Sequence, residues 1–274
     1  PVGAGAVAVA ASFTSEPAIV HFATQAGSYD PDEDEIPELT APRRLPPGVR
    51  VATVIAGLTR AIAPWAWRHK RGSFAGPEVS RADLSRRMRQ GAESLGASYI
   101  KLGQIISSGE GLFPVELVSE FKKCRDQVPP ESFEAVRRTV ETDLGRRLTD
   151  VFEWFDETAL AAASIAQLHA ARLRTGEEVV VKVQRPDVSR LVRKDLRAMA
   201  WIAPRLVGRI PVAALANPPA LVELFAETIV EELDFRLEAA NMLDVATVLR
   251  DLGQDGYVVP RPHPALVSRR VLVM

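Results

Sequence analysis

Lys182 stands inside an otherwise apolar run, Val179-Val180-Val181-Lys182-Val183, which has the length and composition of a β-strand. Side chains alternate between the two faces of a strand, so Lys182 can face a cleft while its valine neighbours face the opposite side. Burying an ammonium group is costly unless an anion meets it, so we expect a phosphate or a carboxylate as its partner. The alternative is a lysine on an edge strand whose ammonium group reaches solvent.

A run of small residues precedes this strand in the sequence and consists of Ala161, Ala162, Ala163 and Ser164. Glycines in a turn between two strands let the backbone approach phosphate groups closely and adopt positive φ angles. Alanine is also small but restricts φ, so we expect phosphates to be held differently here. The alternative is a tight turn that small side chains merely fill.

Acidic residues crowd a predicted helix that follows the lysine strand. They are Glu227, Glu231, Glu232, Asp234 and Glu238. Asp234 and Glu238 lie one helical turn apart and share a face, while Glu232 lies partly round the helix. Like charges so arranged cost stability unless cations meet them, so one of these carboxylates is a candidate partner for Lys182. A solvated acidic face is the alternative.

A third cluster, Lys101-Leu102-Gly103-Gln104, falls in an earlier helical region. Lys101 and Gln104 are three residues apart and project from the same side of a helix. Gly103 costs a helix about 1 kcal/mol relative to alanine, so its presence indicates close approach of another backbone or a ligand. The alternative is a slightly poor surface helix.

Helical periodicity dominates the part of the chain before residue 149. We predict a helix from Val51 to Trp67 that is interrupted at Pro64. A second helix is expected to begin with Ser80 as its N-cap and to continue through Leu102. Two more are predicted at Val115–Arg125 and Phe133–Leu144, the latter ending at the C-capping residue Gly145.

The period then changes to that of strands. An antiparallel meander of three strands is predicted, with a turn at Thr175-Gly176-Glu177, and helical and extended segments follow it. The strands are Val151–Phe155, Ser164–Leu173 and Val179–Val183; the helical segments are Ser189–Val207 and Pro219–Leu249; the extended segments are Tyr257–Val259 and Arg270–Met274. This order predicts an α+β fold in which helices precede a sheet of about five strands.

The composition is that of an ordinary globular protein, with 274 residues of which 47% are apolar and 25% charged. A net charge of −1 gives no reason to expect nucleic acid as a partner. Cys124 is the single cysteine, so no intrachain disulfide can form, and this suits a reducing, cytoplasmic compartment. The four histidines lack ligand-type spacing, so we expect no metal site in this chain.

The N-terminal part of the chain bears on two points, which are disorder and contact with a membrane. Residues 1–48 combine small, acidic and proline-rich stretches that bury little apolar surface, so we expect them to be disordered. No apolar stretch is long enough for a spanning helix. Trp65 and Trp67 stand directly before a basic cluster at 68–71, which fits either a helix at a membrane surface or a helix packed on the domain. The chain begins with proline, which indicates a processed or excerpted piece of a longer protein.

Together the clusters resemble the UbiB/AarF family of atypical protein-kinase-like proteins over residues 80–274. Lys101-Leu102-Gly103-Gln104 resembles the family's KxGQ motif, and the run 161–169 resembles its alanine-rich nucleotide loop and second strand. Val181-Lys182-Val183-Gln184 is similar to its lysine strand. Glu232-Leu233-Asp234 resembles its ExD motif, and Glu238-Ala239-Ala240-Asn241 resembles the segment with its helix C glutamate.

The resemblance implies a kinase-like N-lobe at 149–274, preceded by a helical extension at 49–148 that carries the KxGQ motif. It implies that Lys182 meets nucleotide phosphates and pairs with Glu238, and that Lys101 and Gln104 meet Glu232 and Asp234. It further implies ATP or ADP with Mg²⁺ as ligand, a role in isoprenoid-quinone or lipid metabolism, and contact with membrane lipids or quinone precursors. Protein partners stay unknown at this point.

One departure from the family concerns catalysis. The family's HxDxHxGN-like loop and its DFG-like aspartate have no match after Glu238, and Arg270–Met274 resembles the strand that leads into the hinge. We therefore expect no catalytic residue and no metal ligand within this chain, because both belong to a C-lobe beyond it. The alternatives are a non-catalytic, nucleotide-sensing scaffold and a peripheral membrane protein whose kinase-like lobe is vestigial.

Overall fold

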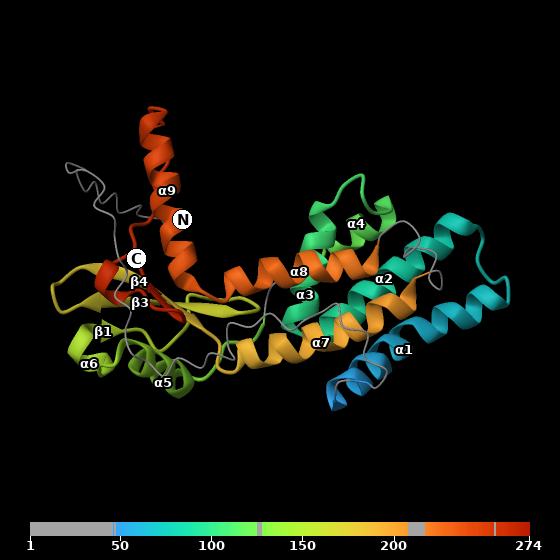
Figure 1. Ribbon diagram of the computed structural model, residues 1–274, viewed down its shortest axis with the longest axis horizontal. Helices are drawn as coiled ribbons and strands as arrows, with labels where there is room; N and C mark the ends of the chain where they lie inside the picture. Colours follow the sequence, from blue (N-terminus) through green and yellow to red (C-terminus); the bar gives the residue numbers. More distant parts are fainter. Residues whose placement is uncertain (1–45, 47, 125–127, 208–216, 255) are drawn as a thin grey trace, which may run out of the picture.

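The computed structural model describes residues 46, 48–124, 128–207, 217–254 and 256–274. The disorder expected for residues 1–48 concerns a segment that, apart from Pro46 and Gly48, lies outside the described residues. The molecule is elongated, with a β-sheet at one end and a bundle of helices at the other (Figure 1). A fold of mixed helices and an antiparallel sheet was predicted, and the structure confirms it.

The helical end is built from segments that precede the first strand and from segments that lie between the fourth and fifth strands in sequence. Its helices are α1 (Val49–Lys70), α2 (Pro77–Leu95), α3 (Ala97–Ser108), α4 (Val115–Phe121), α7 (Val188–Leu206) and α8 (Pro218–Glu232). They share one apolar core in which Leu84, Leu196 and Phe225 are almost completely buried. Helix α7 runs from the sheet into this bundle, and α8 runs back from the bundle toward the sheet (Figure 1).

A buried carboxylate ties three of these helices together. Asp195 on α7 is fully buried and accepts hydrogen bonds from Arg50 Nε at 2.5 Å and from Ser98 Oγ at 2.7 Å. Arg50 also donates to the carbonyl oxygen of Leu95 at 2.7 Å. Because a buried charge is tolerated only when it is paired and hydrogen-bonded, this cluster specifies how α1 and α3 dock on α7.

The sheet contains every strand of the described residues. The strands are β1 (Phe152–Phe155), β2 (Ala161–Ala162), β3 (Ala166–Leu173), β4 (Glu178–Gln184) and β5 (Val271–Val273). Their order is β1-β3-β4-β5, β2 also pairs with β3, and all pairings are antiparallel. Leu168, Lys182 and Leu272 therefore lie side by side across β3, β4 and β5.

The two faces of the sheet bury different partners. On one face, Val181, Val183, Val271 and Val273 pack with the remaining helices of this end, α5 (Phe133–Leu144) and α6 (Leu148–Val151). On the other face, Leu272 packs with the start of α9 (Phe235–Asp251), and α9 then projects away from the body (Figure 1). A short 3₁₀ helix, Pro264–Leu266, precedes β5. The sequence predicted a domain boundary between residues 148 and 149. In the structure, α5 and α6 pack on the sheet, whereas α7 and α8, which follow that boundary in sequence, pack in the helical bundle.

Three predicted helix boundaries at the N-terminal side are wrong. Helix α1 continues through Pro64 to Lys70 rather than breaking there, and Trp65 Nε1 donates to the carbonyl oxygen of Ser80 at 3.0 Å. Packing of this kind offsets the roughly 3 kcal/mol that an interior proline costs. Ser80 is not an N-cap but a buried residue inside α2, which starts after Gly76. The helix expected to run through Leu102 is split at Gly96, whose φ of 104° suits glycine.

Later boundaries differ as well. The helical stretch predicted at Pro219–Leu249 is two helices, because Asp234 caps a second one by accepting a hydrogen bond from the backbone N–H of Arg236 at 3.0 Å. The acidic residues thus lie on two helices rather than one. The segment Tyr257–Val259 is not a strand, and the fifth strand is instead β2. Helix α4 ends at Phe121, earlier than predicted.

The best-predicted helix is α5. Its bounds are those expected, Phe133–Leu144, and Gly145 ends it with a φ of 61°. The side chain of Ser132 caps the other end by accepting a hydrogen bond from the N–H of Ala135. Capping residues next to the helix in sequence therefore determine where it begins and where it ends.

Candidate functional site

The central feature of the sheet is an ion pair on its α9 face. Lys182 Nζ lies 2.6 Å from both carboxylate oxygens of Glu238, which is in the first turn of α9. The ammonium also lies 4.8 Å from the ring centroid of Phe235, a residue that is fully buried. Lys182 is 22% exposed at its side chain and Glu238 38%. The ring of Phe235 thus packs against the ammonium group, and part of the ion pair is accessible to solvent.

Local structure explains why these two side chains meet. The alternation of β4 buries Val181 and Val183 on one face and turns Lys182 to the other. Helix α9 is held against the sheet at its start, because the backbone N–H of Phe235 donates to the carbonyl oxygen of Arg269 at 3.0 Å. Gln184 Nε2, at the end of β4, donates to the carbonyl oxygen of Leu233 at 3.0 Å. These contacts, one from the end of β4 and one from the segment just before β5, fix the position of Glu238 over the lysine.

A second ion pair links the helical bundle to the same region. Lys101 Nζ on α3 lies 2.7 Å from Oε1 of Glu232, the last residue of α8. Both side chains are partly exposed, at 23% and 30%. Residues 233 and 234 connect this end of α8 to α9. Lys101 therefore contacts a residue that lies just before the helix that carries Glu238.

The expected meeting of Gln104 with Asp234 is not what the structure shows. Asp234 pairs with the guanidinium of Arg236, with Nη2 to Oδ2 at 2.6 Å, and also caps α9. The backbone carbonyl of Gln104 accepts hydrogen bonds from Ser107 and Ser108 on the same helix. Asp234 is therefore a helix-capping residue here, because it lies at the break between two helices that the periodicity did not reveal.

Gly103 has a packing reason. A Cβ atom added at this position would lie 2.4 Å from Cδ1 of Phe121, a contact that real Cβ atoms do not make. The glycine thus lets the ring of Phe121 on α4 pack directly against the backbone of α3. The close approach expected at Gly103 is made by a side chain rather than by a ligand.

The alanine run forms a narrow strand and turn beside β3. Ala161 and Ala162 pair with Leu168 and Gln167, and the N–H of Ala163 donates to the carbonyl oxygen of Ala166 at 2.8 Å. Ser164 is 2% exposed. Arg185 Nε donates to the carbonyl oxygen of Ala163 at 2.9 Å, which ties the turn to the end of β4.

Arg185 is a residue that the sequence reasoning missed. Its guanidinium donates to Glu131 Oε1 at 2.7 Å and to the carbonyl oxygens of Val128 and Pro129 at 3.3 and 2.8 Å. It is 8% exposed. One side chain therefore holds together the alanine turn, the end of β4 and the segment before α5, and no local pattern in the sequence marks it.

His169 occupies a second buried polar array under the alanine turn. Its Nδ1 lies 2.8 Å from the carbonyl oxygen of Asp156, and its Nε2 lies 2.8 Å from Nε2 of Gln167. The carbonyl accepts from Nδ1, and the amide nitrogen of Gln167 donates to Nε2. Gln167 Oε1 in turn accepts from the N–H of Glu131 at 2.8 Å. Both ring nitrogens are used, so His169 is structural.

Two further properties bear on ligands. In the described part of the chain, no group of three or more His, Cys, Asp or Glu side chains could hold a metal ion. Among the same residues, no helix is long and apolar enough to cross a membrane. Lys182 and the turn at Ala161–Ser164 can offer positive charge and small side chains to an anion.

A family model, the ABC1 atypical kinase-like domain, matches residues 123–274. A probable protein kinase UbiB from Aeromonas salmonicida is 39% identical over 215 residues, which are 77% of this chain and 39% of that protein. An uncharacterized aarF domain-containing chloroplastic protein kinase from Arabidopsis thaliana is 39% identical over 189 residues, which are 68% of this chain and 35% of that protein. The chain thus spans well under half the length of these relatives.

Among solved structures, the erythromycin complex of Rv3197 from Mycobacterium tuberculosis is similar to this chain. It is 32% identical, with a TM-score of 0.42, and the match covers 53% of this chain and 35% of the other.

Proposed function

Because the chain belongs to the ABC1 atypical kinase-like family, we propose that it supplies the nucleotide-binding lobe of an ATP-dependent atypical kinase or ATPase. The observation that carries the proposal is the Lys182–Glu238 pair. A lysine held by a helix carboxylate on the third long strand of a small antiparallel sheet is the arrangement that orients nucleotide phosphates in kinases.

The roles of the two residues follow from their contacts. Glu238 holds the Lys182 ammonium at 2.6 Å through both oxygens, which restricts a flexible side chain to one direction. The open side of Lys182 can then neutralise phosphate oxygens of ATP or ADP without reorganisation. Ala161, Ala162, Ala163 and Ser164 would border the same phosphates as a small-residue turn. Arg185 fixes the shape of that turn.

Magnesium and the reacting groups belong to another part of the proposed enzyme. Among the described residues, no group of three or more His, Cys, Asp or Glu side chains could hold a divalent cation. When bound, Mg²⁺ would neutralise charge on the phosphates. The aspartates that hold it and that assist phosphoryl transfer are proposed to lie in a C-lobe beyond this chain.

For the cellular role, we propose support of isoprenoid-quinone or lipid metabolism by a cytoplasmic protein that touches the membrane surface. Trp67 at the end of α1 is 57% exposed, and the guanidinium of Arg71 lies 3.7 Å from its ring centroid. Arg68, His69 and Lys70 complete a basic helix end. An exposed aromatic beside basic residues suits the headgroup region of an anionic bilayer, although α1 is also packed on α2 through Trp65.

The test compares nucleotide binding by the wild type with that of Lys182→Met and Lys194→Met, measured by calorimetry with MgATP and MgADP. Lys194 is exposed on α7 and serves as the matched control. Loss of one charged hydrogen bond is worth about 1.5–3 kcal/mol, so we expect Lys182→Met to bind at least about tenfold more weakly. Equal affinity in all three proteins would overturn the proposal. Tight binding with no ATP turnover by the full-length protein on liposomes would support the alternative, a nucleotide-sensing scaffold.

A further inference from the structure

The helical bundle contains a cavity of about 610 Å³ that the nucleotide proposal does not use. It lies among α1, α2, α3, α4, α7 and α8, away from the ion pair of the sheet. Long apolar side chains from these helices form much of its wall, among them Leu58, Met88, Leu102, Phe121, Met199 and Leu221. The volume falls in the range of roughly 300–1,000 Å³ that is typical of small-molecule sites.

The wall of the cavity is chemically uniform. Within the described part of the chain, none of its lining residues is charged, and the polar side chains among them are Thr59 and Tyr99. Burial, together with the nearby charge of Asp195, raises the pKa of the Tyr99 phenol, so this group stays neutral. A charged group inside the cavity would therefore be unpaired, which is costly.

Small residues create the space. Ala63 and Ala66 on α1, Ala92 on α2 and Ala203 on α7 line the cavity. Larger side chains at these positions would fill it, as close packing does in most protein interiors. The two methionines of the wall have flexible thioether side chains, which adapt to ligands of varied shape.

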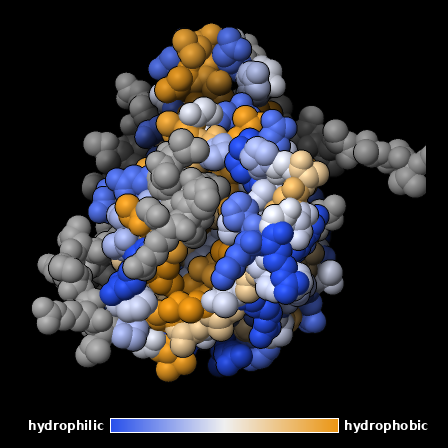
Figure 2. Space-filling view, turned by 90° about the vertical axis from the view of Figure 1, so that its right-hand side faces the viewer, coloured by the Kyte–Doolittle hydropathy of each residue, from blue (hydrophilic) through white to orange (hydrophobic). Residues whose placement is uncertain are grey.

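One side of the cavity reaches the surface along α1. Ile55 is 43% exposed, and Thr59, Ala63 and Ala66 are also exposed although they line the cavity. Seen from the helical end of the molecule, hydrophobic side chains gather in the lower part of the face (Figure 2). An apolar molecule could thus enter beside α1 and leave a polar end in water near Thr59.

From this we propose that the bundle cavity binds a single hydrocarbon chain, either acyl or isoprenoid, whose polar head stays at the α1 surface. An extended peptide is a poor occupant, because its backbone N–H and C=O groups would find almost no partners among these side chains. Water is equally poor, since it needs two to four polar partners. A flexible apolar chain meets neither objection, and its transfer from water is favourable in proportion to the area buried.

The test uses cis-parinaric acid, whose fluorescence rises in apolar surroundings, with the 274-residue chain and no nucleotide. Ala63→Phe and Ala66→Phe fill the cavity from its exposed side and so spare the buried core. Ala56→Phe is the matched control, because Ala56 is exposed on the same helix but does not line the cavity. We expect saturable binding that falls at least tenfold in either cavity variant and is unchanged in the control.

Competition then separates the two sources of the chain. Displacement of the probe by palmitate indicates an acyl ligand, and displacement by geranylgeraniol indicates an isoprenoid ligand; both support the proposal. Absence of probe binding, failure of both competitors, or equal binding by the wild type and the cavity variants would overturn it. Lys182→Met should bind the probe normally, so the outcome is independent of nucleotide binding.

Discussion

Lys101 Nζ lies 2.7 Å from Oε1 of Glu232, so α3 is joined to the residue that ends α8, and only Leu233 separates that residue from Asp234, the cap of α9. Both side chains are partly exposed, and pairs of this kind contribute about 0.2–1 kcal/mol. We expect a double-mutant cycle with Lys101→Met and Glu232→Gln to give a coupling energy within that range by urea unfolding. The exchange Lys101→Glu with Glu232→Lys should recover most of the stability that either single charge reversal loses.

The matched control for this cycle is the surface pair of Lys122 and Glu110. Both of its side chains are more than half exposed, so its cycle should show no measurable coupling. Equal coupling in the two cycles would mean that the Lys101 contact is an ordinary surface pair.

Gly103→Ala should destabilise the bundle although alanine is the better helix former. The added Cβ would meet Cδ1 of Phe121 at 2.4 Å, and overpacking of a core costs about 1–3 kcal/mol. Higher helix propensity returns roughly 1 kcal/mol, and because the added atom would meet the rigid ring well inside contact distance, the upper part of that cost applies, so a net loss of up to about 2 kcal/mol is expected by chemical denaturation. The shorter side chain of Phe121→Leu should reduce that loss. If the alanine costs the same in both backgrounds, the ring contact is not the reason for the glycine.

Arg185 should be far more important to stability than its place at the end of a strand indicates. Arg185→Met removes bonds to Glu131 and to the carbonyl oxygens of three residues, all in a nearly buried position. Charged hydrogen bonds contribute about 1.5–3 kcal/mol each but are not additive, so we expect a loss of about 2–4 kcal/mol in thermal or urea unfolding. Arg185→Lys should recover only part of it, because one ammonium cannot reach all of these acceptors.

An exposed arginine of the same sheet is the control for that measurement. Arg172 pairs with Glu178 across the surface ends of β3 and β4. Arg172→Met should leave the unfolding midpoint unchanged, since exposed pairs contribute little. A similar loss in the two methionine variants would show that the Arg185 network has no special weight.

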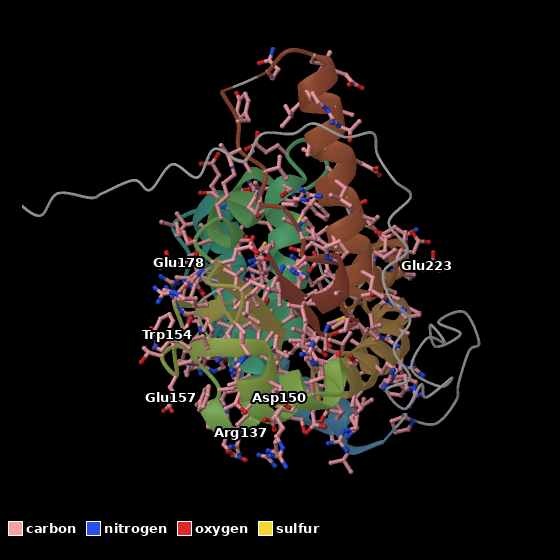
Figure 3. The ribbon with its side chains drawn as sticks, turned by 90° about the vertical axis from the view of Figure 1, so that its left-hand side faces the viewer. Arg137, Asp150, Trp154, Glu157, Glu178 and Glu223 are labelled. Atoms are coloured by element: carbon pink, nitrogen blue, oxygen red, sulfur yellow. The ribbon has the colours of Figure 1, made fainter. Side chains whose placement is uncertain are left out.

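Local sequence patterns were sufficient to predict an element where the periodicity and the residues at its ends agree. Helix α5 was predicted to the residue because an apolar stripe ends at Gly145, which adopts the left-handed conformation that ends many helices. The lysine strand was found because one charged residue interrupts a run of valines. The side chains that surround the sheet can be followed in Figure 3, in which residues such as Arg137, Asp150 and Trp154 extend from the sheet end.

Long-range contacts account for the errors and omissions. The network of Arg185 joins residues 22 to 57 positions apart, so no periodicity can reveal it. Pro64 remains inside α1 because packing around Trp65 outweighs the local penalty. The pairing of Lys182 with Glu238, 56 residues apart, was expected from the family resemblance and not from spacing. Asp234 caps α9 and pairs with Arg236 instead of meeting Gln104, and the helix break that places it there was not predicted from the periodicity.

Asp83 makes the stability of the folded protein depend on pH in the acidic range. It lies on α2, is 7% exposed, and accepts hydrogen bonds from Arg87 Nε at 2.8 Å and from Arg86, with Arg68 at 3.9 Å. Burial alone would raise the pKa of Asp83, but the guanidinium groups of Arg87, Arg86 and Arg68 outweigh it and hold that pKa below its ordinary value of 3.8.

The direction of the acid effect follows from linkage. The unfolded state binds a proton at Asp83 at higher pH than the folded state does, so this residue contributes stability above about pH 4 that is lost as the pH falls through the folded pKa. Asp83→Asn should therefore be less stable than the wild type at pH 7, and the difference between the two proteins should shrink between about pH 4 and pH 2. The measurement is the urea unfolding midpoint at a series of pH values. Asp244→Asn, a change at an exposed residue of α9, should follow the wild-type curve throughout. A constant gap between wild type and Asp83→Asn across this pH range would contradict the assignment, because the arginine cluster would then stabilise the two forms of the carboxyl group equally.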